Sequence, residues 1–162
     1  MESTKAQIFL IRLCFYSGII GLCSAWAAEY IFDIKPCSLC LYQRYLLIII
    51  TFIAGSSAYI LPPRLIKRMI FITGLCFLAA AVIAFYHVGL EEKWFKDIGI
   101  CQTHLQADSI EALRQQLLNQ APVSCSQASW RLFGLSFAGY NLGFSLLMAF
   151  LCFSQMFQFS KR

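Results

Sequence analysis

Residues 35–52 read KPCSLCLYQRYLLIIITF and place a Cys-x-x-Cys pair directly before a long apolar run. The run continues as LLIIITFIA without alternation of polar and apolar residues, which excludes a strand of a membrane β-barrel. About 20 apolar residues are needed for a helix to cross the hydrocarbon core of a bilayer. The stretch therefore predicts a membrane helix that carries two thiols at its N-terminal end.

The composition of the whole chain indicates an integral membrane protein. Of its 162 residues, 59% are hydrophobic and only 13% are charged, whereas a soluble domain carries about 25% charged residues. A backbone in hydrocarbon must satisfy its own hydrogen bonds, which favours helices. We predict an all-α fold in which residues 1–162 form one domain, a four-helix membrane bundle. The expected spans are residues 8–28, 41–61, 69–88 and 132–156.

The charged residues predict how the spans are oriented. One side of the predicted bundle carries most of the basic residues near its helix ends: Lys5, Arg12, Arg64, Lys67, Arg68, Lys161 and Arg162. The loops expected on the other side, residues 29–40 and 89–131, contain seven of the eight acidic residues. Positively charged loops remain in the cytoplasm. We therefore expect both termini to be cytoplasmic and both loops to be extracytoplasmic.

Residues 23–27, CSAWA, offer an alternative for the first span, because small residues after an apolar run are typical of a signal-peptide cleavage site. The apolar run before them is longer than the core of a usual signal peptide. We expect the first span to be retained.

The predicted topology divides the eight cysteines into two groups. Four fall within spans, where a free cysteine packs as a small hydrophobic residue: Cys14, Cys23, Cys76 and Cys152. Four fall on the extracytoplasmic side, where disulfides persist: Cys37, Cys40, Cys101 and Cys125. Four cysteines permit three pairings, and the sequence alone does not choose among them. The local position of Cys37 and Cys40 at a helix start favours their pairing, which leaves Cys101 and Cys125.

Three interpretations compete for these four cysteines: two structural disulfides, a zinc site or a redox relay. A closed site of four cysteines generally uses two Cys-x-x-Cys motifs, and only one is present, so we expect no metal. A disulfide across a short loop removes little entropy from the unfolded chain. A thiol at a helix N-terminus, by contrast, has a lowered pKa and is reactive. The pattern favours the relay.

Arg44 and His87 are candidate partners of the reactive pair. Arg44 follows Cys40 by one helical turn and either extends to the membrane surface or faces the bundle interior. We expect it to stabilise a Cys40 thiolate and to donate to an electron acceptor. His87 ends the third span on the same side, either near Arg44 or as an interfacial residue. Haem and flavin motifs are absent from the sequence, so the location favours a lipid-soluble quinone as acceptor.

Three segments, PCSLCLYQR (36–44), YHVGLE (86–91) and CSQASWRLFGLS (125–136), resemble the bacterial disulfide bond formation protein B family. The resemblance covers the four spans and both cysteine pairs. It implies a protein-disulfide:quinone oxidoreductase of the bacterial inner membrane, with its redox loops in the periplasm. The implied partner is a DsbA-like periplasmic thiol oxidase, and the implied cofactor is ubiquinone or menaquinone.

The resemblance also implies roles for individual residues. Catalysis is assigned to the four extracytoplasmic cysteines, Cys37, Cys40, Cys101 and Cys125. Cys101 forms the mixed disulfide with the partner, whereas Cys40, Arg44 and His87 lie at the quinone. Gln43 departs from the family pattern, which commonly has an acidic residue before the arginine, and the loop between Cys101 and Cys125 is slightly short. Both departures bear on the choice of partner rather than on the chemistry.

The long loop contains a further predicted element. Residues 108–118, DSIEALRQQLL, place apolar side chains on one helical face and predict a short amphipathic helix. A loop between membrane spans offers the bilayer surface to such a face. We expect this helix to lie on the membrane and to let Cys101 move between the Cys37–Cys40 pair and the partner.

Two other classes of protein share parts of this pattern. A vitamin K epoxide reductase-like protein also combines a membrane Cys-x-x-Cys with loop cysteines, but its motif lies in a late span and here it opens the second. A four-span scaffold with structural disulfides would show stable bridges and no dependence on a quinone.

Overall fold

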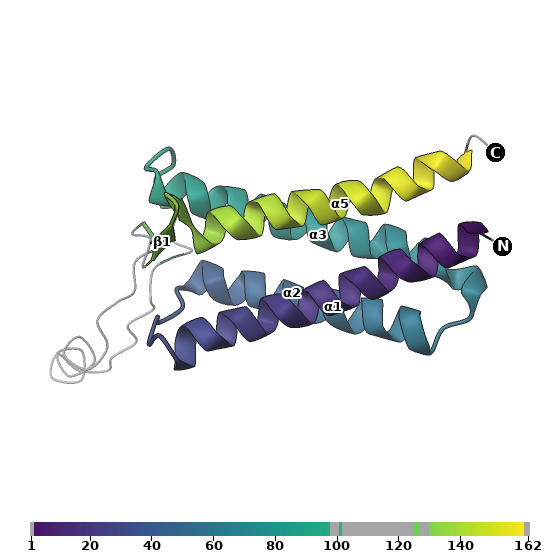
Figure 1. The fold of residues 1–162 in the computed structure, drawn as a ribbon. Coiled ribbons are helices and arrows are strands. Elements are labelled where there is room, and N and C mark those ends of the chain that lie inside the picture. The colour runs from purple at the N-terminus through teal and green to yellow at the C-terminus, as the bar shows by residue number, and fades with distance from the viewer. Residues whose placement is uncertain (1, 98–100, 102–124, 127–129, 161–162) are drawn as a thin grey trace, which may run out of the picture.

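Four long helices lie side by side in the computed structural model, which describes residues 2–97, 101, 125–126 and 130–160 (Figure 1). They are α1 (Glu2–Tyr30), α2 (Ser38–Tyr59), α3 (Pro63–Glu91) and α5 (Phe137–Ser160). Each contains a segment that is long and apolar enough to cross a membrane. The predicted four-helix membrane bundle is confirmed. The amphipathic helix expected over residues 108–118 lies outside the described residues.

The bundle is held together by an apolar core and is apolar on its outside as well. Helix α1 packs mainly on α2, and α3 packs mainly on α5 and α2. The main core cluster takes buried side chains from all four helices, among them Ile11, Ile50 and Phe77. On the outside, the side chains of Phe9 and Phe52 are 70% and 74% exposed. Such exposure is costly in water and suits a surface that faces lipid.

The helix ends follow local sequence signals. Cys37 caps α2 with an extended backbone, and α3 begins at Pro63, where the missing N–H of proline costs no hydrogen bond. The last helix begins at Phe137 rather than at the expected Leu132. Ser136 precedes it, and its Oγ accepts a hydrogen bond from the N–H of Gly139 at 3.2 Å, as in a helix N-cap.

The residues before α5 form a small antiparallel hairpin of β1 (Arg131–Leu132) and β2 (Leu135–Ser136). Gly134, at the turn, has a positive φ of 82°, a conformation that glycine adopts without steric cost. Arg131 donates to Glu92 at the end of α3, with 2.8 Å between Nη2 and Oε1. Residues 132–135 of the hairpin, LFGL, are apolar, and hydropathy therefore extended the predicted span through them.

The ends of the helices separate into two groups. The Glu2 end of α1 and the Ser160 end of α5 lie at one end of the bundle (Figure 1). The start of α2, the end of α3, the hairpin and the start of α5 lie at the other end. This second end brings Cys37, His87 and Phe137 together.

Candidate functional site

The Cys-x-x-Cys pair forms the first turn of α2. Cys37 is the N-cap residue, and its sulfur accepts a hydrogen bond from the backbone N–H of Cys40 at 3.4 Å. The sulfurs of Cys37 and Cys40 lie 3.1 Å apart, and both residues are free thiols in this structure. One turn of helix is thus sufficient to hold both sulfurs in contact.

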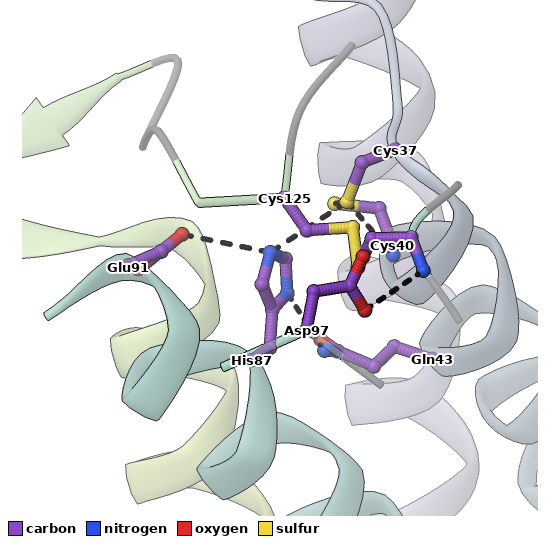
Figure 2. The surroundings of a disulfide bond; sticks show 8 residues. Cys37, Cys40, Gln43, His87, Glu91, Asp97 and Cys125 are labelled. Atoms are coloured by element: carbon purple, nitrogen blue, oxygen red, sulfur yellow. Dashed lines mark hydrogen bonds and ion pairs between the residues drawn. A yellow bond between two sulfur atoms is a disulfide. The ribbon is translucent and has the colours of Figure 1, made fainter. Parts of the chain in front are cut away.

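The second pair of cysteines lies directly against the first. Cys101 and Cys125 are joined by a disulfide, the pairing expected from the sequence. Cys125 is buried and belongs to one cluster with Cys37, Leu39 and Leu90, against which Cys40 and Cys101 also pack (Figure 2). The structure therefore brings Cys37, Cys40, Cys101 and Cys125 together, with one pair as a dithiol and the other as a disulfide.

His87 is oriented by a chain of polar side chains that crosses three helices. Gln43 donates from Nε2 to Nδ1 of His87 at 3.1 Å, and its Oε1 accepts from Nδ2 of Asn141 at 2.7 Å. Ser145 donates to Oδ1 of Asn141 at 3.4 Å. Because Nδ1 accepts, the proton of the neutral imidazole resides on Nε2. That nitrogen lies 3.6 Å from the Cys37 sulfur and 3.6 Å from Oε1 of Glu91 (Figure 2).

The contacts of the dithiol favour a thiolate at Cys37. The hydrogen bond with Cys40 lowers the pKa of Cys37 most, and the hydrogen bond from His87 lowers it further. Burial opposes both, and the resulting pKa is about 4, compared with an ordinary value of 9.0. The sequence led us to expect the thiolate at Cys40. The side-chain contacts of Cys37 with Cys40 and His87 explain most of the difference, and the backbone N–H of Cys40, which donates to the Cys37 sulfur, adds a smaller contribution.

We expect alkylation of the fully reduced protein to show this pKa directly. Only the thiolate reacts with iodoacetamide, so the rate at Cys37 should stay constant down to about pH 5 and fall as the pH passes below about 4. His87→Gln should move the fall to higher pH, because it removes a donor to the thiolate. Peptide mass spectrometry with a metal chelator present measures the rate, and the denatured chain is the control. A midpoint near 9 in the folded protein would contradict the assignment.

Arg44 is tied to the first helix. It forms an ion pair with Glu29 and donates from Nη2 to the carbonyl oxygen of Ala25 at 3.3 Å. Its side chain is 14% exposed, so it faces the bundle interior as expected. The expected contact with a Cys40 thiolate is replaced by the pair with Glu29, because a largely buried guanidinium needs a close counter-charge. Its Nε is buried and has no hydrogen-bond partner among the described residues.

A cavity of about 380 Å³ opens beside these residues. Its walls include the three side chains predicted for a quinone site, Cys40, Arg44 and His87. Apolar side chains from α1, α2 and α5, such as Leu47 and Phe144, line much of the rest. The volume lies within the usual range for small-molecule sites, about 300–1,000 Å³. An apolar ring that bears oxygen acceptors fits these walls, because the guanidinium of Arg44 is a hydrogen-bond donor in a lining that is otherwise largely apolar.

The family model described as "Disulfide bond formation protein DsbB" matches residues 7–155. The chain belongs to the DsbB family. It is 29% identical over 150 residues to "Disulfide bond formation protein B" of Acinetobacter baumannii, which covers 88% of this chain and 86% of that protein. It is 27% identical over 152 residues to "Disulfide bond formation protein B 2" of Pseudomonas fluorescens, covering 91% and 82%.

A third relative is "Uncharacterized protein RP370" of Rickettsia prowazekii, 29% identical over 128 residues that cover 77% of this chain and 73% of that protein. No solved structure matches the chain. Membership of the DsbB family, together with four spanning helices, makes the protein a multi-pass membrane oxidoreductase of disulfide bond formation.

Sequence reasoning missed three residues that shape the site of this DsbB-family protein. Glu29 pairs with Arg44, Glu91 lies beside His87, and Asn141 supports Gln43. Glu29 and Glu91 were counted only as loop charges. Asn141 carried a usable signal, because an amide within an apolar span has to find a hydrogen-bond partner.

Proposed function

We propose that this protein reoxidises a DsbA-like periplasmic thiol oxidase and transfers the electrons through two disulfides to a membrane quinone. The supporting observation is the single cluster of four cysteines beside a cavity that Arg44 and His87 line. A structural scaffold needs no contact between its two pairs and no cavity at the reactive one. Both features follow naturally from a relay.

The first exchange takes place at the loop disulfide. A thiolate of the reduced partner attacks the sulfur of Cys101, because Cys125 is only 1% exposed. A partner–Cys101 bond forms, the Cys101–Cys125 bond breaks, and Cys125 leaves as a thiolate. The second thiol of the partner then attacks its own mixed disulfide. The partner departs oxidised, and two thiols remain on the loop.

The second exchange transfers the electrons inward. The Cys125 thiolate attacks Cys37 of an oxidised Cys37–Cys40 pair, since the two residues pack in one cluster. Cys40 leaves as a thiolate beside the cavity. Cys101 then attacks Cys125, which restores the loop disulfide and leaves Cys37 and Cys40 as the dithiol. That state corresponds to the bonding pattern described above.

Three side chains prepare the site for an electron acceptor. A bound quinone supplies the capacity to accept two electrons and two protons. Cys40 and Arg44 both line the cavity, and the guanidinium of Arg44 is suited to donate a hydrogen bond to a ring oxygen. His87 keeps a proton on Nε2, within 3.6 Å of the Cys37 sulfur. Loss of two electrons from the dithiol restores the Cys37–Cys40 disulfide.

The proposed location is the bacterial inner membrane, with both termini in the cytoplasm and the cysteines facing the periplasm. The supporting observation is the segregation of charge. Arg64, Lys67 and Arg68 lie in the first two turns of α3, directly after the short connection from α2, at the end that also carries the termini (Figure 1). Basic residues in short loops favour the cytoplasmic side.

Turnover of the purified full chain tests the proposed function. The protein in detergent is mixed with a reduced DsbA-like oxidase and with either ubiquinone or menaquinone, and quinone absorbance is followed. We expect quinone-dependent turnover. The double variant Cys14→Ala/Cys152→Ala should retain it, because these two cysteines belong to the main core cluster and not to the cluster of the four site cysteines. Absence of turnover with both quinones, combined with disulfides that resist reduction, would favour the structural scaffold.

Arg44→Ala should slow electron transfer to the quinone about 10- to 100-fold, the value of one hydrogen bond from a charged group. Thiol exchange with the partner, measured by stopped-flow tryptophan fluorescence without quinone, should change little. Removal of Arg44 also leaves Glu29 unpaired, so Arg44→Ala/Glu29→Gln is the matched control for that effect. Equal loss in both reactions would contradict a role at the acceptor.

A further inference from the structure

The dithiol form of the site holds three metal-binding atoms close together. They are the sulfurs of Cys37 and Cys40 and Nε2 of His87, all within 4.8 Å of one another. The two sulfurs are 3.1 Å apart, and Nε2 lies 3.6 Å from the Cys37 sulfur. Figure 2 shows these side chains converging from α2 and α3 on one point beside the loop disulfide.

These separations are close to those of a tetrahedral zinc site. With Zn–S near 2.3 Å and Zn–N near 2.0 Å, neighbouring ligand atoms lie about 3.5 to 3.8 Å apart. Small side-chain rotations therefore bring all three atoms to bonding distance. Two cysteines and one histidine leave the fourth position open, as in sites that bind a water molecule. The cavity gives access to that position, and the Glu91 carboxylate also lines it.

We propose that the reduced Cys37–Cys40 pair, together with His87, binds a thiophilic divalent cation such as Zn²⁺, and that the disulfide form does not. Binding joins the metal to two thiolates and one imidazole nitrogen and releases the thiol proton of Cys40, with no change of oxidation state. The thiolate electron pairs that bind the cation are the same ones that the Cys37–Cys40 disulfide requires. A bound cation therefore holds the pair reduced and arrests the electron relay.

The hydrogen bonds that orient His87 can serve both the metal-free and the metal-bound imidazole. A metal on Nε2 requires the proton to move to Nδ1 and to find an acceptor, as ligating histidines generally do. Gln43 carries both a donor and an acceptor on one amide, so rotation of that amide turns Oε1 toward His87. Asn141, the partner of Gln43, can rotate in the same way. A matched Gln43→Leu variant should bind the cation more weakly, about 10-fold or more.

This site differs from a zinc site of four cysteines. Cys101 and Cys125 are bonded to each other and contribute no thiolate. The third ligand is His87, which lies far from the Cys-x-x-Cys motif in the sequence. The inference needs only a reducible Cys37–Cys40 pair. Cation binding therefore stands or fails independently of the quinone and of the protein partner, whereas the arrest of the relay rests on the proposed function.

A titration of the reduced full chain with Cd²⁺, followed by Zn²⁺ competition, tests the inference. A Cys101→Ser/Cys125→Ser background removes the loop thiols, and thiolate-to-Cd²⁺ charge-transfer absorption reports binding. We expect one strong site, weakened at least about 10-fold by Cys37→Ser or His87→Gln. Cys14→Ala/Cys152→Ala should leave it unchanged, which excludes the other close thiol pair, with 3.8 Å between its sulfurs.

A second measurement tests the inference without any substitution of Cys37, Cys40 or His87. The same protein, oxidised so that Cys37 and Cys40 form a disulfide, should lose the charge-transfer absorption and regain it after reduction. Equal binding in both redox states would overturn the proposal, and so would a His87→Gln variant that is folded and binds as the background does.

Discussion

Replacement of Cys40 by serine should reduce quinone-dependent turnover by at least about 10³-fold, because a serine hydroxyl neither forms a disulfide nor ionises near neutral pH. Cys40 lies at the junction of the two halves of the proposed relay. Its sulfur contacts Cys37 at 3.1 Å and also borders the cavity. Without it, Cys37 has no partner with which to accept electrons from the loop. Quinone absorbance in the presence of a reduced DsbA-like oxidase measures the loss.

Two controls distinguish the loss of chemistry from the loss of fold. Cys76→Ser introduces the same atom change into a free thiol of α3 and should retain turnover. Cys40→Ser should retain the helical content and thermal unfolding of the parent protein, because serine is nearly isosteric. If Cys40→Ser kept turnover within a few-fold of the parent, electrons would have to bypass the Cys-x-x-Cys pair.

Cys125→Ser should separate the two halves of the relay. Turnover with the protein partner should fall by at least about 10³-fold, because the proposed exchange from the loop to Cys37 passes through the Cys125 sulfur. Turnover with a small dithiol such as dithiothreitol should persist, since such a molecule can reduce the Cys37–Cys40 pair directly. The ratio of the two rates, measured on one protein preparation, reports this separation.

The same variant also tests the order of attack. Cys125→Ser leaves Cys101 as a lone thiol, which should trap an oxidised partner as a stable mixed disulfide visible on a non-reducing gel. Cys101→Ser should give much less of that complex, because Cys125 is buried. A complex that formed only through Cys125 would reverse the assignment of the two loop cysteines.

The stabilised Cys37 thiolate bears on the energetics of the relay. A thiolate that is favoured in the dithiol stabilises the reduced state and makes the corresponding disulfide more oxidising. The contacts from Cys40 and His87 therefore help the Cys37–Cys40 pair to accept electrons from the loop. His87→Gln removes one of these contacts and is expected to make the pair less oxidising.

The fold was predictable because its strongest signal is the length of apolar segments. Residues 41–61, for example, were assigned to a membrane helix because an apolar segment of that length in hydrocarbon must satisfy its own backbone hydrogen bonds. The start of α5 was harder to predict, because the hairpin of residues 131–136 has the apolar residues 132–135 at its centre. Hydropathy measures transfer to lipid and does not register the backbone reversal at Gly134.

The site was predictable where the chemistry is local and unpredictable where it depends on packing. The Cys-x-x-Cys motif at a helix start indicated a reactive pair without any structure. The choice between Cys37 and Cys40 as thiolate depended on the N-cap geometry and on a histidine from another helix. The pairing of Arg44 with Glu29 required knowledge of which face of α1 meets α2.

The amide of Asn141 has a consequence for biosynthesis. Cys37, Cys40 and Gln43 leave the ribosome early, and His87 follows with α3, but Asn141 belongs to the last helix to be made. Until α5 is inserted, Gln43 lacks the partner that directs its N–H toward His87. A nascent or truncated chain therefore carries the two thiols and His87 without the amide that fixes Gln43. The hydrogen-bond chain from Asn141 through Gln43 to His87 is therefore complete only after the last helix has been made.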